Sequence, residues 1–400
     1  MDLFVGIDVS KHKHDVAIVN EQKKLVGQQF VITDDLQGYQ SLVNRLDHFA
    51  HQWPVESFYI GLESTADYWK NLYYYLKRQS DAFRLTVINP VQTKAHAKTE
   101  LRRAKTDPVN AKDIACFMVE KRPEPSYSRQ LIFDVIKDID KQIYQYRKQQ
   151  TMSVNKLRME LNKVAPEIEK AVDNIKGKQI LALLAQLPTA HTISDSSDST
   201  LRDIRYGKNN WRLPRPFIEN IKALAANSVA YKTGDGAGYV VQSLARTISH
   251  FQQEIVCLKR QLSELYQCST ETGSLLATIP GISPETAIVL EAYIGDVGRF
   301  ANAKKFVAYF GMNPTVNLSG KHAGKSYLQK KGATIVRHKL FMSTLCMVGR
   351  EVEPIISFYQ RLIDAGKPKL VAIAACMRKL LVIIYYMLKN RQPFSLQSKK

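Results

Sequence analysis

The stretch Leu3-Phe4-Val5-Gly6-Ile7-Asp8 is a short apolar run that ends in a carboxylate, and the fold prediction starts from it. Such a run predicts a buried strand with Asp8 at its carboxyl end. A second run of the same kind, Phe58-Tyr59-Ile60-Gly61-Leu62-Glu63, also ends in a carboxylate. Further strand-like runs occupy residues 15–19, 24–33 and 85–88. The beginning of the chain therefore predicts a sheet in which two strands carry acids at their ends.

Helical patterns separate these strand-like runs. Apolar residues recur with helical spacing between residues 36 and 46 and again between 68 and 76, and Asn89-Pro90 closes the last strand before another helix. The predicted order is three strands, helix, strand, helix, strand, helix. This is the order of a ribonuclease-H-like α/β domain, which we assign to residues 1–128, with an all-α remainder after it.

The overall charge points to a polyanionic partner. Lys and Arg number 57 against 37 Asp and Glu, which gives a formal net charge of +20 over 400 residues. Such an excess destabilises a compact chain by self-repulsion, which nucleic acid would offset. A basic protein with no such partner is the plainer alternative, but the positive charge is clustered rather than even.

The cysteines and the two ends of the chain indicate in which cellular compartment the protein acts. The five cysteines form no CxxC pair and several lie in apolar, helix-like stretches, so we expect reduced thiols rather than disulfides or zinc ligands. The N-terminus lacks the pattern of a signal peptide. The apolar stretch at residues 380–388 is too short to span a bilayer and is expected to be a packed helix. We therefore expect a cytoplasmic protein with no membrane partner.

The two strand-end acids suggest a metal site. If their strands are neighbours in the sheet, Asp8 and Glu63 reach the same edge, where carboxylate oxygens suit Mg²⁺. Two such ions can activate a nucleophile and stabilise a leaving oxygen on phosphorus. A single acid at a strand end is more often a turn residue, but two at matching places are harder to explain in that way.

A third acid lies in Lys105-Thr106-Asp107-Pro108-Val109-Asn110-Ala111-Lys112-Asp113. Asp before Pro predicts a helix start, with Asp107 as N-cap and Pro108 at the first position. Asn110, three residues on, would share the helix face with Asp107. Asp107 either caps the helix only or joins Asp8 and Glu63 at the metal.

The middle of the chain is predicted to be helical. Apolar residues recur at steps of three and four between residues 132 and 164 and between 248 and 265, which is typical of a coiled-coil seam. Two such helices can pair within one chain, between chains in a dimer or tetramer, or in both ways, and a plain helical bundle is an equal alternative. We divide this part into coiled-coil helices at 129–175 and 241–270 and a helical insertion at 176–240.

Residues 271–400 are predicted to form a second functional domain. Leu276-Ala277-Thr278-Ile279-Pro280-Gly281-Ile282-Ser283-Pro284-Glu285-Thr286-Ala287 has the pattern of a helix-hairpin-helix, in which Gly281 permits the turn and the second helix offers N–H groups to a phosphate. An ordinary helix corner is the alternative. A loop rich in small residues follows at 313–332, and its cations can neutralise phosphates. These cations are Lys321, Lys325, Lys330 and Lys331.

These motifs together resemble one family. Gly6-Ile7-Asp8-Val9-Ser10-Lys11, then Glu63-Ser64-Thr65, then Lys105-Thr106-Asp107 are similar to the DEDD insertion-sequence transposases related to the Piv DNA invertase. The resemblance implies a RuvC-like domain with Asp8, Glu63 and Asp107 as metal ligands and Lys105 near nucleic acid. The family's fourth acid falls on Asn110 here, and Asp113 is the other candidate for that position.

The resemblance extends to the last part of the chain, where the family takes the serine of a Ser-Gly pair as the nucleophile. That role falls on Ser319, with Ser326 as the reserve. The resemblance implies a transposase or recombinase that cuts and rejoins DNA with Mg²⁺, acts with a guide (bridge) RNA, and forms homo-oligomers.

Three other functions remain open from the residues alone. A metal-dependent junction nuclease would need the carboxylates but not Ser319. An actin-like sugar kinase also opens with Gly-Ile-Asp, but it would need further glycine-rich phosphate loops and fits the charge poorly. A non-catalytic DNA-binding protein would carry out no Mg²⁺-dependent strand transfer.

Overall fold

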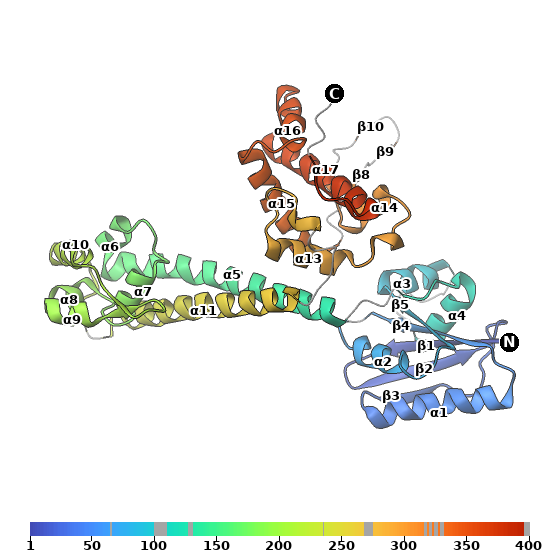
Figure 1. Ribbon diagram of the computed structural model, residues 1–400. Helices are drawn as coiled ribbons and strands as arrows, with labels where there is room; N and C mark the ends of the chain where they lie inside the picture. The colour runs from blue at the N-terminus through green and yellow to red at the C-terminus, as the bar shows by residue number, and fades with distance from the viewer. Residues whose placement is uncertain are drawn as a thin grey trace. The chain divides into compact units, whose positions relative to one another are not determined.

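The computed structural model describes residues 1–64, 66–99, 110–126, 131–234, 236–267, 275–315, 318–319, 322–323, 327–328 and 332–395. The chain divides into two compact units, Met1–Ser128 and Arg129–Lys400, which are described one after the other. Figure 1 shows the elements of both. The first unit is a mixed α/β structure and the second is mostly helical, so the predicted fold class, α/β followed by all-α, is confirmed.

A five-stranded sheet forms the centre of the first unit. Its strands lie in the order β3 (Phe30–Thr33), β2 (Lys13–Val19), β1 (Asp2–Val9), β4 (Ser57–Glu63) and β5 (Phe83–Ile88). β1 runs antiparallel to β2 and parallel to β4, and β5 runs parallel to β4. The element order agrees with the one that predicted a ribonuclease-H-like domain. The third strand is shorter than the predicted run at 24–33, and Gly27, within that run but outside the strand, takes a left-handed conformation (φ 76°).

Helices cover both faces of this sheet. α1 (Leu36–Gln52) and α2 (Trp69–Leu76) pack on the face that receives Leu3, Val5 and Ile7. On the other face, α4 (Ala111–Lys121) packs on Phe4, and α3 (Pro90–Thr99) contacts α4. β1 therefore alternates between two cores, as a strand buried on both sides must.

Gly6 allows α4 to lie close to the sheet. A Cβ atom added at Gly6 would lie 2.0 Å from the backbone oxygen of Ala111 and 2.4 Å from the backbone nitrogen of Ala115. No side chain fits in that space. The contact holds the first turn of α4 over β1, two residues before Asp8.

The start of α4 differs from the prediction. Asn110 is its N-cap, with an extended backbone (φ −105°, ψ 172°), and the helix begins at Ala111. The prediction that this helix begins with Asp107 as N-cap and Pro108 at its first position is therefore wrong, and Asn110 itself precedes the helix. Asp107 and Pro108 lie outside the described residues. A capping box between Asn110 and Asp113 fixes the start of the helix more strongly than the Asp-Pro pair, because it satisfies two backbone N–H groups at once.

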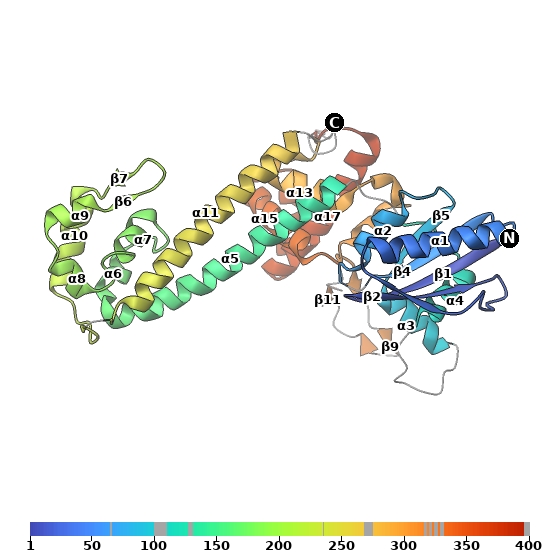
Figure 2. The same ribbon diagram turned by 90° about the horizontal axis from the view of Figure 1, so that it is seen from below.

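Two long helices dominate the second unit. α5 (Leu131–Val164) and α11 (Tyr239–Gln267) lie side by side, as both Figure 1 and Figure 2 show. The rings of Tyr146 and Phe251 meet between them with centroids 5.6 Å apart. The predicted apolar stripes thus pair within one chain.

A small lobe, residues 165–238, surrounds the ends of the helix pair at Val164 and Tyr239. Its elements are α6 (Pro166–Ala171), α7 (Lys178–Leu184), α8 (Ala190–Ser194), α9 (Asp198–Asp203), β6 (Arg205–Tyr206), β7 (Trp211–Arg212) and α10 (Arg215–Ala226). They share one core with Leu157, Leu161 and Ile248 of the long helices. The β6–β7 hairpin is an addition to the helical insertion that the sequence predicted.

The helices of the C-terminal part are α13 (Pro284–Ile294), the 3-10 helix η1 (Val297–Arg299), α14 (Ala303–Tyr309), α15 (Thr334–Gly349), α16 (Ile355–Asp364) and α17 (Lys369–Asn390). Two pairs of short strands lie between α14 and α15: β8 (Pro314–Thr315) with β11 (Tyr327–Leu328), and β9 (Leu318–Ser319) with β10 (His322–Ala323). The core of this part also takes in Phe133, Ile136 and Leu262 from the long helices.

α17 is longer than the apolar stretch predicted at 380–388. Its 22 residues are long and apolar enough to cross a membrane by length and composition. Ile373, Cys376, Leu380 and Ile384 are nevertheless buried in the C-terminal core, as a core helix requires. The described cysteines, which are Cys116, Cys257, Cys346 and Cys376, form no disulfide.

Candidate functional site

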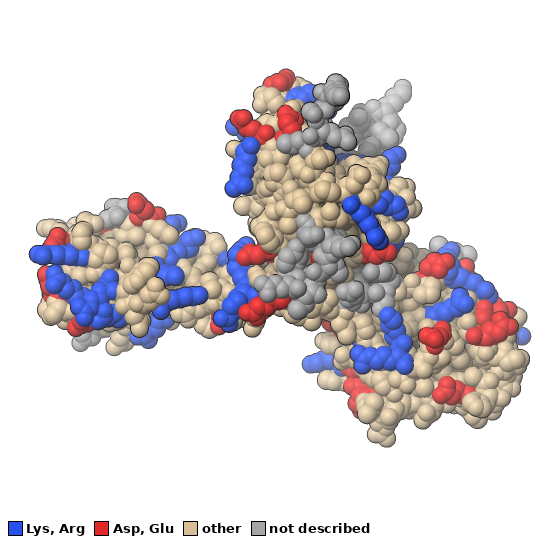
Figure 3. Space-filling view, in the orientation of Figure 1, with Lys and Arg blue, Asp and Glu red and all other residues tan. Residues whose placement is uncertain are grey.

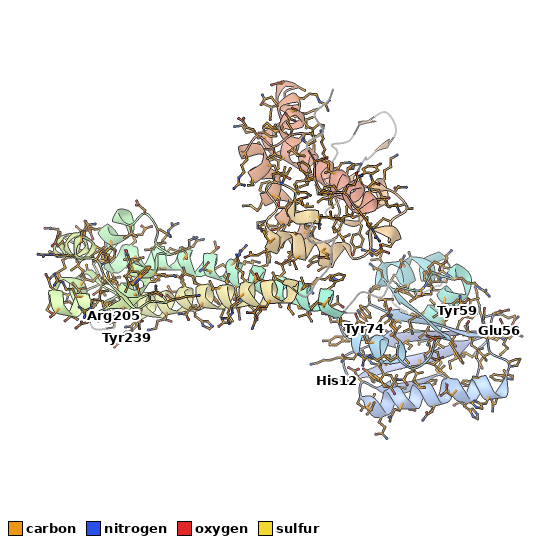
Figure 4. All side chains as sticks on the ribbon, in the orientation of Figure 1. His12, Glu56, Tyr59, Tyr74, Arg205 and Tyr239 are labelled. Carbon is orange, nitrogen blue, oxygen red and sulfur yellow. The ribbon has the colours of Figure 1, made fainter. Side chains whose placement is uncertain are left out.

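Three carboxylates form a row across the strands β2, β1 and β4, near the carboxyl ends of β1 and β4. Ile7 of β1 is in register with Leu62 of the parallel strand β4, so Asp8 and Glu63 are the next positions along the two strands. On the other side of β1, Asp15 of β2 lies directly opposite Asp8. Residues in register on neighbouring strands project to the same face. The acids lie on the face covered by α4, on which Tyr59 (labelled in Figure 4) stacks on Phe4 with ring centroids 5.1 Å apart.

Charge repulsion and burial act together on Asp8. Its pKa is raised from 3.8 to about 6, first by burial and then by the negative charges of Glu63 and Asp15. A cation at this place would remove the repulsion and favour the ionised form. The donor chemistry of Asp8 and Glu63 therefore fits a hard divalent metal ion.

Glu63 is held by a residue that the sequence did not indicate. Its side chain is 6% exposed, and its Oε1 accepts a hydrogen bond of 3.1 Å from Thr93 Oγ1 on α3. Thr93 is itself 2% exposed. This contact holds one carboxylate oxygen of Glu63 against α3, where the same hydroxyl also lies 3.1 Å from the Pro90 carbonyl. A polar residue on the buried face of the helix after β5 was the only signal for it.

Asn110 and Asp113 satisfy each other at the start of α4. Asn110 Oδ1 accepts a hydrogen bond of 3.1 Å from the Asp113 backbone nitrogen, and Asp113 Oδ2 accepts one of 3.2 Å from the Asn110 backbone nitrogen. Asp113 is 5% exposed, so its side chain is buried at the start of α4. Both candidates for the fourth ligand thus have a role in capping α4.

Two of the three predicted ligands, Asp8 and Glu63, are brought together by the fold. Asp107 and Lys105 lie outside the described residues. Within the part of the chain that the structure describes, no group of three or more His, Cys, Asp and Glu side chains is arranged as a metal centre. The carboxylate row therefore consists of the adjacent strand-end acids Asp8 and Glu63, with Asp15 on the other side of Asp8.

The helix-hairpin-helix region forms the second candidate site. Gly281 has φ +92°, and an added Cβ would lie 2.8 Å from Met347 Cγ and 3.1 Å from the Ser343 oxygen of α15. Only glycine fits this turn and this close packing. Ser283 caps α13 by accepting a hydrogen bond of 3.2 Å from the Thr286 backbone nitrogen.

A cleft of about 230 Å³ opens at this helix start, between α5, α13 and α15. Arg147, His338 and Lys339 line it together with the acids Asp140 and Glu285. Lys339 Nζ lies 2.8 Å from Asp140 Oδ1, so one cation of the cleft is already paired. The cleft thus offers a helix N-terminus beside Arg147 and His338, with which no carboxylate among the described residues forms an ion pair.

The predicted serine loop is fixed at both ends. Arg378 of α17 donates hydrogen bonds to the Met312 carbonyl (3.3 Å) and to Asn313 Oδ1 (3.0 Å). At the far end, Arg337 donates to the Gly332 carbonyl (2.9 Å). Between these ends, the Ser319 backbone pairs with His322. Ser326, Lys321, Lys325, Lys330 and Lys331 lie outside the described residues.

Comparison with known proteins matches both parts of the chain. A DEDD-type IS110 transposase model matches residues 5–166, and the model of the transposase IS116/IS110/IS902 family matches residues 273–360. The pilin gene-inverting proteins of Moraxella bovis and Moraxella lacunata are each 25% identical over 395 residues, which cover 98% of this chain and 97% of theirs. An uncharacterised 43.6 kDa protein of insertion element IS110 from Streptomyces coelicolor is 23% identical over 180 residues, 45% of this chain and 44% of that protein.

Proposed function

The chain belongs to the IS110 family of transposases and DNA invertases and is therefore a DNA recombinase, and from this premise we propose how its residues cut and rejoin DNA. In the proposal, Asp8, Glu63 and Asp107 hold Mg²⁺, and Ser319 is the nucleophile. The DEDD family model supports a divalent metal in general terms. The observation that carries the proposal is the adjacency of Asp8 and Glu63 on parallel strands, with the pKa of Asp8 raised to about 6.

The carboxylates have a defined task in this proposal. When bound, Mg²⁺ would stabilise the negative charge that develops on phosphate oxygens during strand cleavage. Thr93 orients Glu63 through the bond to Oε1, and Asp15 adds a third negative charge that attracts the cation. Asn110 and Asp113 are the two proposed sources of a fourth ligand, and the capping box keeps either one at the start of α4.

Ser319 would perform the covalent step. Its Oγ attacks a backbone phosphorus, an Oγ–P bond forms, and the bond from phosphorus to one sugar oxygen breaks. The serine proton leaves to a base, and the released sugar oxygen takes up a proton. In the rejoining step a sugar hydroxyl of another strand attacks the phosphorus of the Ser319–DNA phosphodiester, a new sugar oxygen–phosphorus bond forms and the Oγ–P bond breaks. The hydroxyl gives up its proton and Ser319 Oγ takes one up, so the number of phosphodiester bonds is unchanged. Ser326 is the alternative nucleophile in the same loop.

Basic groups of both units would hold the DNA. Lys321, Lys325, Lys330 and Lys331 would neutralise phosphates near Ser319, Lys105 would do so near the carboxylates, and the α13 start beyond Gly281 would bind a phosphate. The fixed ends of the loop at Asn313 and Gly332 support a reproducible position for the serine. We further propose a guide RNA as a partner and a homodimer or homotetramer as the active assembly.

A covalent-adduct assay tests the proposal. The protein is incubated with Mg²⁺ and a labelled DNA substrate that carries the element ends, and protein–DNA adducts are separated under denaturing conditions. Ser319→Ala should abolish the adduct, and Asp8→Ala should abolish recombination, while both variants keep nucleic-acid binding. Cleavage that continues in Ser319→Ala without an adduct would favour the metal-dependent junction nuclease instead. An adduct that is lost only in Ser326→Ala would move the role to Ser326.

A further inference from the structure

A basic groove runs from the lobe along the helix α11. It has a volume of about 940 Å³ and lies between α7, the β6–β7 hairpin and α11. Five exposed cations line it: Lys178, Arg205, Lys208, Arg246 and Arg260. None of the described residues that line it is Asp or Glu. Figure 3 shows Lys and Arg side chains gathered on one face of the lobe, and Figure 4 labels Arg205 there.

Among the described residues, ion pairs compensate some cations of the lobe outside the groove, but only one of the five within it. Outside the groove, Arg215 pairs with Glu219 at 2.8 Å and Lys222 with Asp198 at 2.7 Å. Within it, Arg260 lies 3.6 Å from Glu264. Among the residues that the structure describes, no carboxylate pairs with the remaining four cations of the groove. The charge of the groove is therefore largely uncompensated.

The hairpin places two like charges against each other. Arg205 and Arg212 are direct cross-strand partners on β6 and β7, and both are exposed. Like charges in this position destabilise a hairpin. Contacts of Tyr206 hold the strands in this register: its ring lies 6.0 Å from that of Trp211, and its hydroxyl accepts a hydrogen bond of 2.9 Å from Gln179. An anion bound along this face would attract both arginines and offset their mutual repulsion.

The length of the groove fits a polyanion better than a single anion. Arg246 and Arg260 are fourteen positions apart on α11, which is about 21 Å along a helix. A DNA duplex carries one negative charge per about 1.7 Å of its axis, so several phosphates can meet this row. The floor between the cations is apolar, with Leu181, Ala182 and Val256, and suits the sugar faces of a backbone.

We propose that this groove binds the phosphate backbone of duplex DNA, as a contact surface separate from the carboxylate row and the serine loop. The inference rests on the activity of the chain as a DNA recombinase, and it adds a further place at which the enzyme holds its substrate. DNA is the occupant that the charge complementarity and the recombinase activity favour together. The binding would be independent of sequence, because backbone contacts carry no base information.

The test compares two full-length variants with the same loss of charge. The groove variant is Arg205→Gln/Lys208→Gln/Arg246→Gln. The control is Arg158→Gln/Arg215→Gln/Lys222→Gln, which removes three cations of the same region that are ion-paired. Affinity for a labelled DNA duplex is measured by fluorescence anisotropy over a series of salt concentrations, and thermal melting checks that both variants are folded.

The groove variant should bind duplex DNA more weakly. The negative slope of log K against log salt concentration should become less steep by about 2 to 3, because each of the three lost phosphate contacts contributes about 0.9 to its magnitude. The control should keep the parent slope. Equal losses in both variants would show that net charge alone matters, and an unchanged groove variant would show that DNA does not bind there; either result overturns the proposal. A loss seen only with an RNA probe of the same sequence would overturn it in favour of RNA. Ser319→Ala should keep the parent slope, so a failure of the serine proposal stays distinguishable.

Discussion

Asp15 on β2 lies directly opposite Asp8 on β1. The relationship gives Asp8 a carboxylate neighbour on each side, because Glu63 occupies the adjoining place on β4. Together with burial, these charges raise the pKa of Asp8 to about 6. The site is therefore electrostatically unfavourable when it is ionised and without a cation, which makes its behaviour dependent on both pH and metal.

The first prediction concerns thermal stability. The folded pKa of Asp8 lies above the ordinary value of 3.8, so its protonated form stabilises the fold. That contribution is present at pH values below the ordinary pKa and is lost as the pH rises through about 6. Mg²⁺ should therefore raise the melting temperature more at about pH 7 than at about pH 5, where protons compete with the metal. Calorimetry with and without Mg²⁺ measures this, and the difference should disappear in Asp8→Asn.

The second prediction concerns the start of α4. Asn110→Asp keeps a good N-cap and adds a negative charge, so the Mg²⁺ concentration for half-maximal recombination should fall if position 110 is a ligand. Asn110→Ala should lower the stability by about 1 kcal/mol through the lost cap. A metal titration in which both variants equal the parent would remove Asn110 from the ligand set. Asp113→Ala as damaging as Asp8→Ala would assign the place to Asp113.

The third prediction concerns Gly6. Gly6→Ala forces a Cβ against the Ala111 carbonyl, so it should lower the free energy of unfolding by about 1 to 3 kcal/mol. It should also weaken Mg²⁺ binding, because α4 must move away from the strand that carries Asp8. Gly349→Ala is the control, since no atom lies within 4 Å of an added Cβ there. Equal denaturation curves for the two variants would contradict the close packing.

The fourth prediction concerns the assembly. A chain with Glu63→Ala keeps Ser319, and a chain with Ser319→Ala keeps Glu63. If the active assembly shares these groups between protomers, a mixture of the two inactive chains should recover part of the recombination activity. Mixed oligomers, verified by two different affinity tags, that remain inactive would show that each protomer must supply both groups itself.

Local patterns predicted the strand-end acids well. An apolar run that ends in a carboxylate specifies the face and the end of a strand without knowledge of its neighbours, so Asp8 and Glu63 were placed correctly at the ends of β1 and β4. Asp15 was not anticipated as a member of the row. Its position opposite Asp8 depends on the register set by the turn after Val9, and that register is not written in the alternation of apolar residues.

Local patterns failed where two signals competed within a few residues. Asp107-Pro108 and the Asn110–Asp113 pair both mark helix starts, and propensity cannot choose between them. The tertiary contact of Gly6 with the backbone of Ala111 belongs to a helix that begins at Ala111. The β6–β7 hairpin was missed for another reason. Its strands are two residues each, too short for any periodicity, and packing of Tyr206 and Trp211 specifies it instead.

The helix pair has a consequence for how such proteins diverge. The chain enters the lobe through α5 and returns through α11, so the two points of attachment are neighbours (Figure 2). Among the described residues, the lobe shares no core residues with the C-terminal part. Insertions between adjacent attachment points are tolerated because they leave the remaining core intact. A lengthening of both helices by seven residues would keep the same faces in contact. The lobe can therefore change in size or be replaced as a unit during evolution while the C-terminal core stays constant.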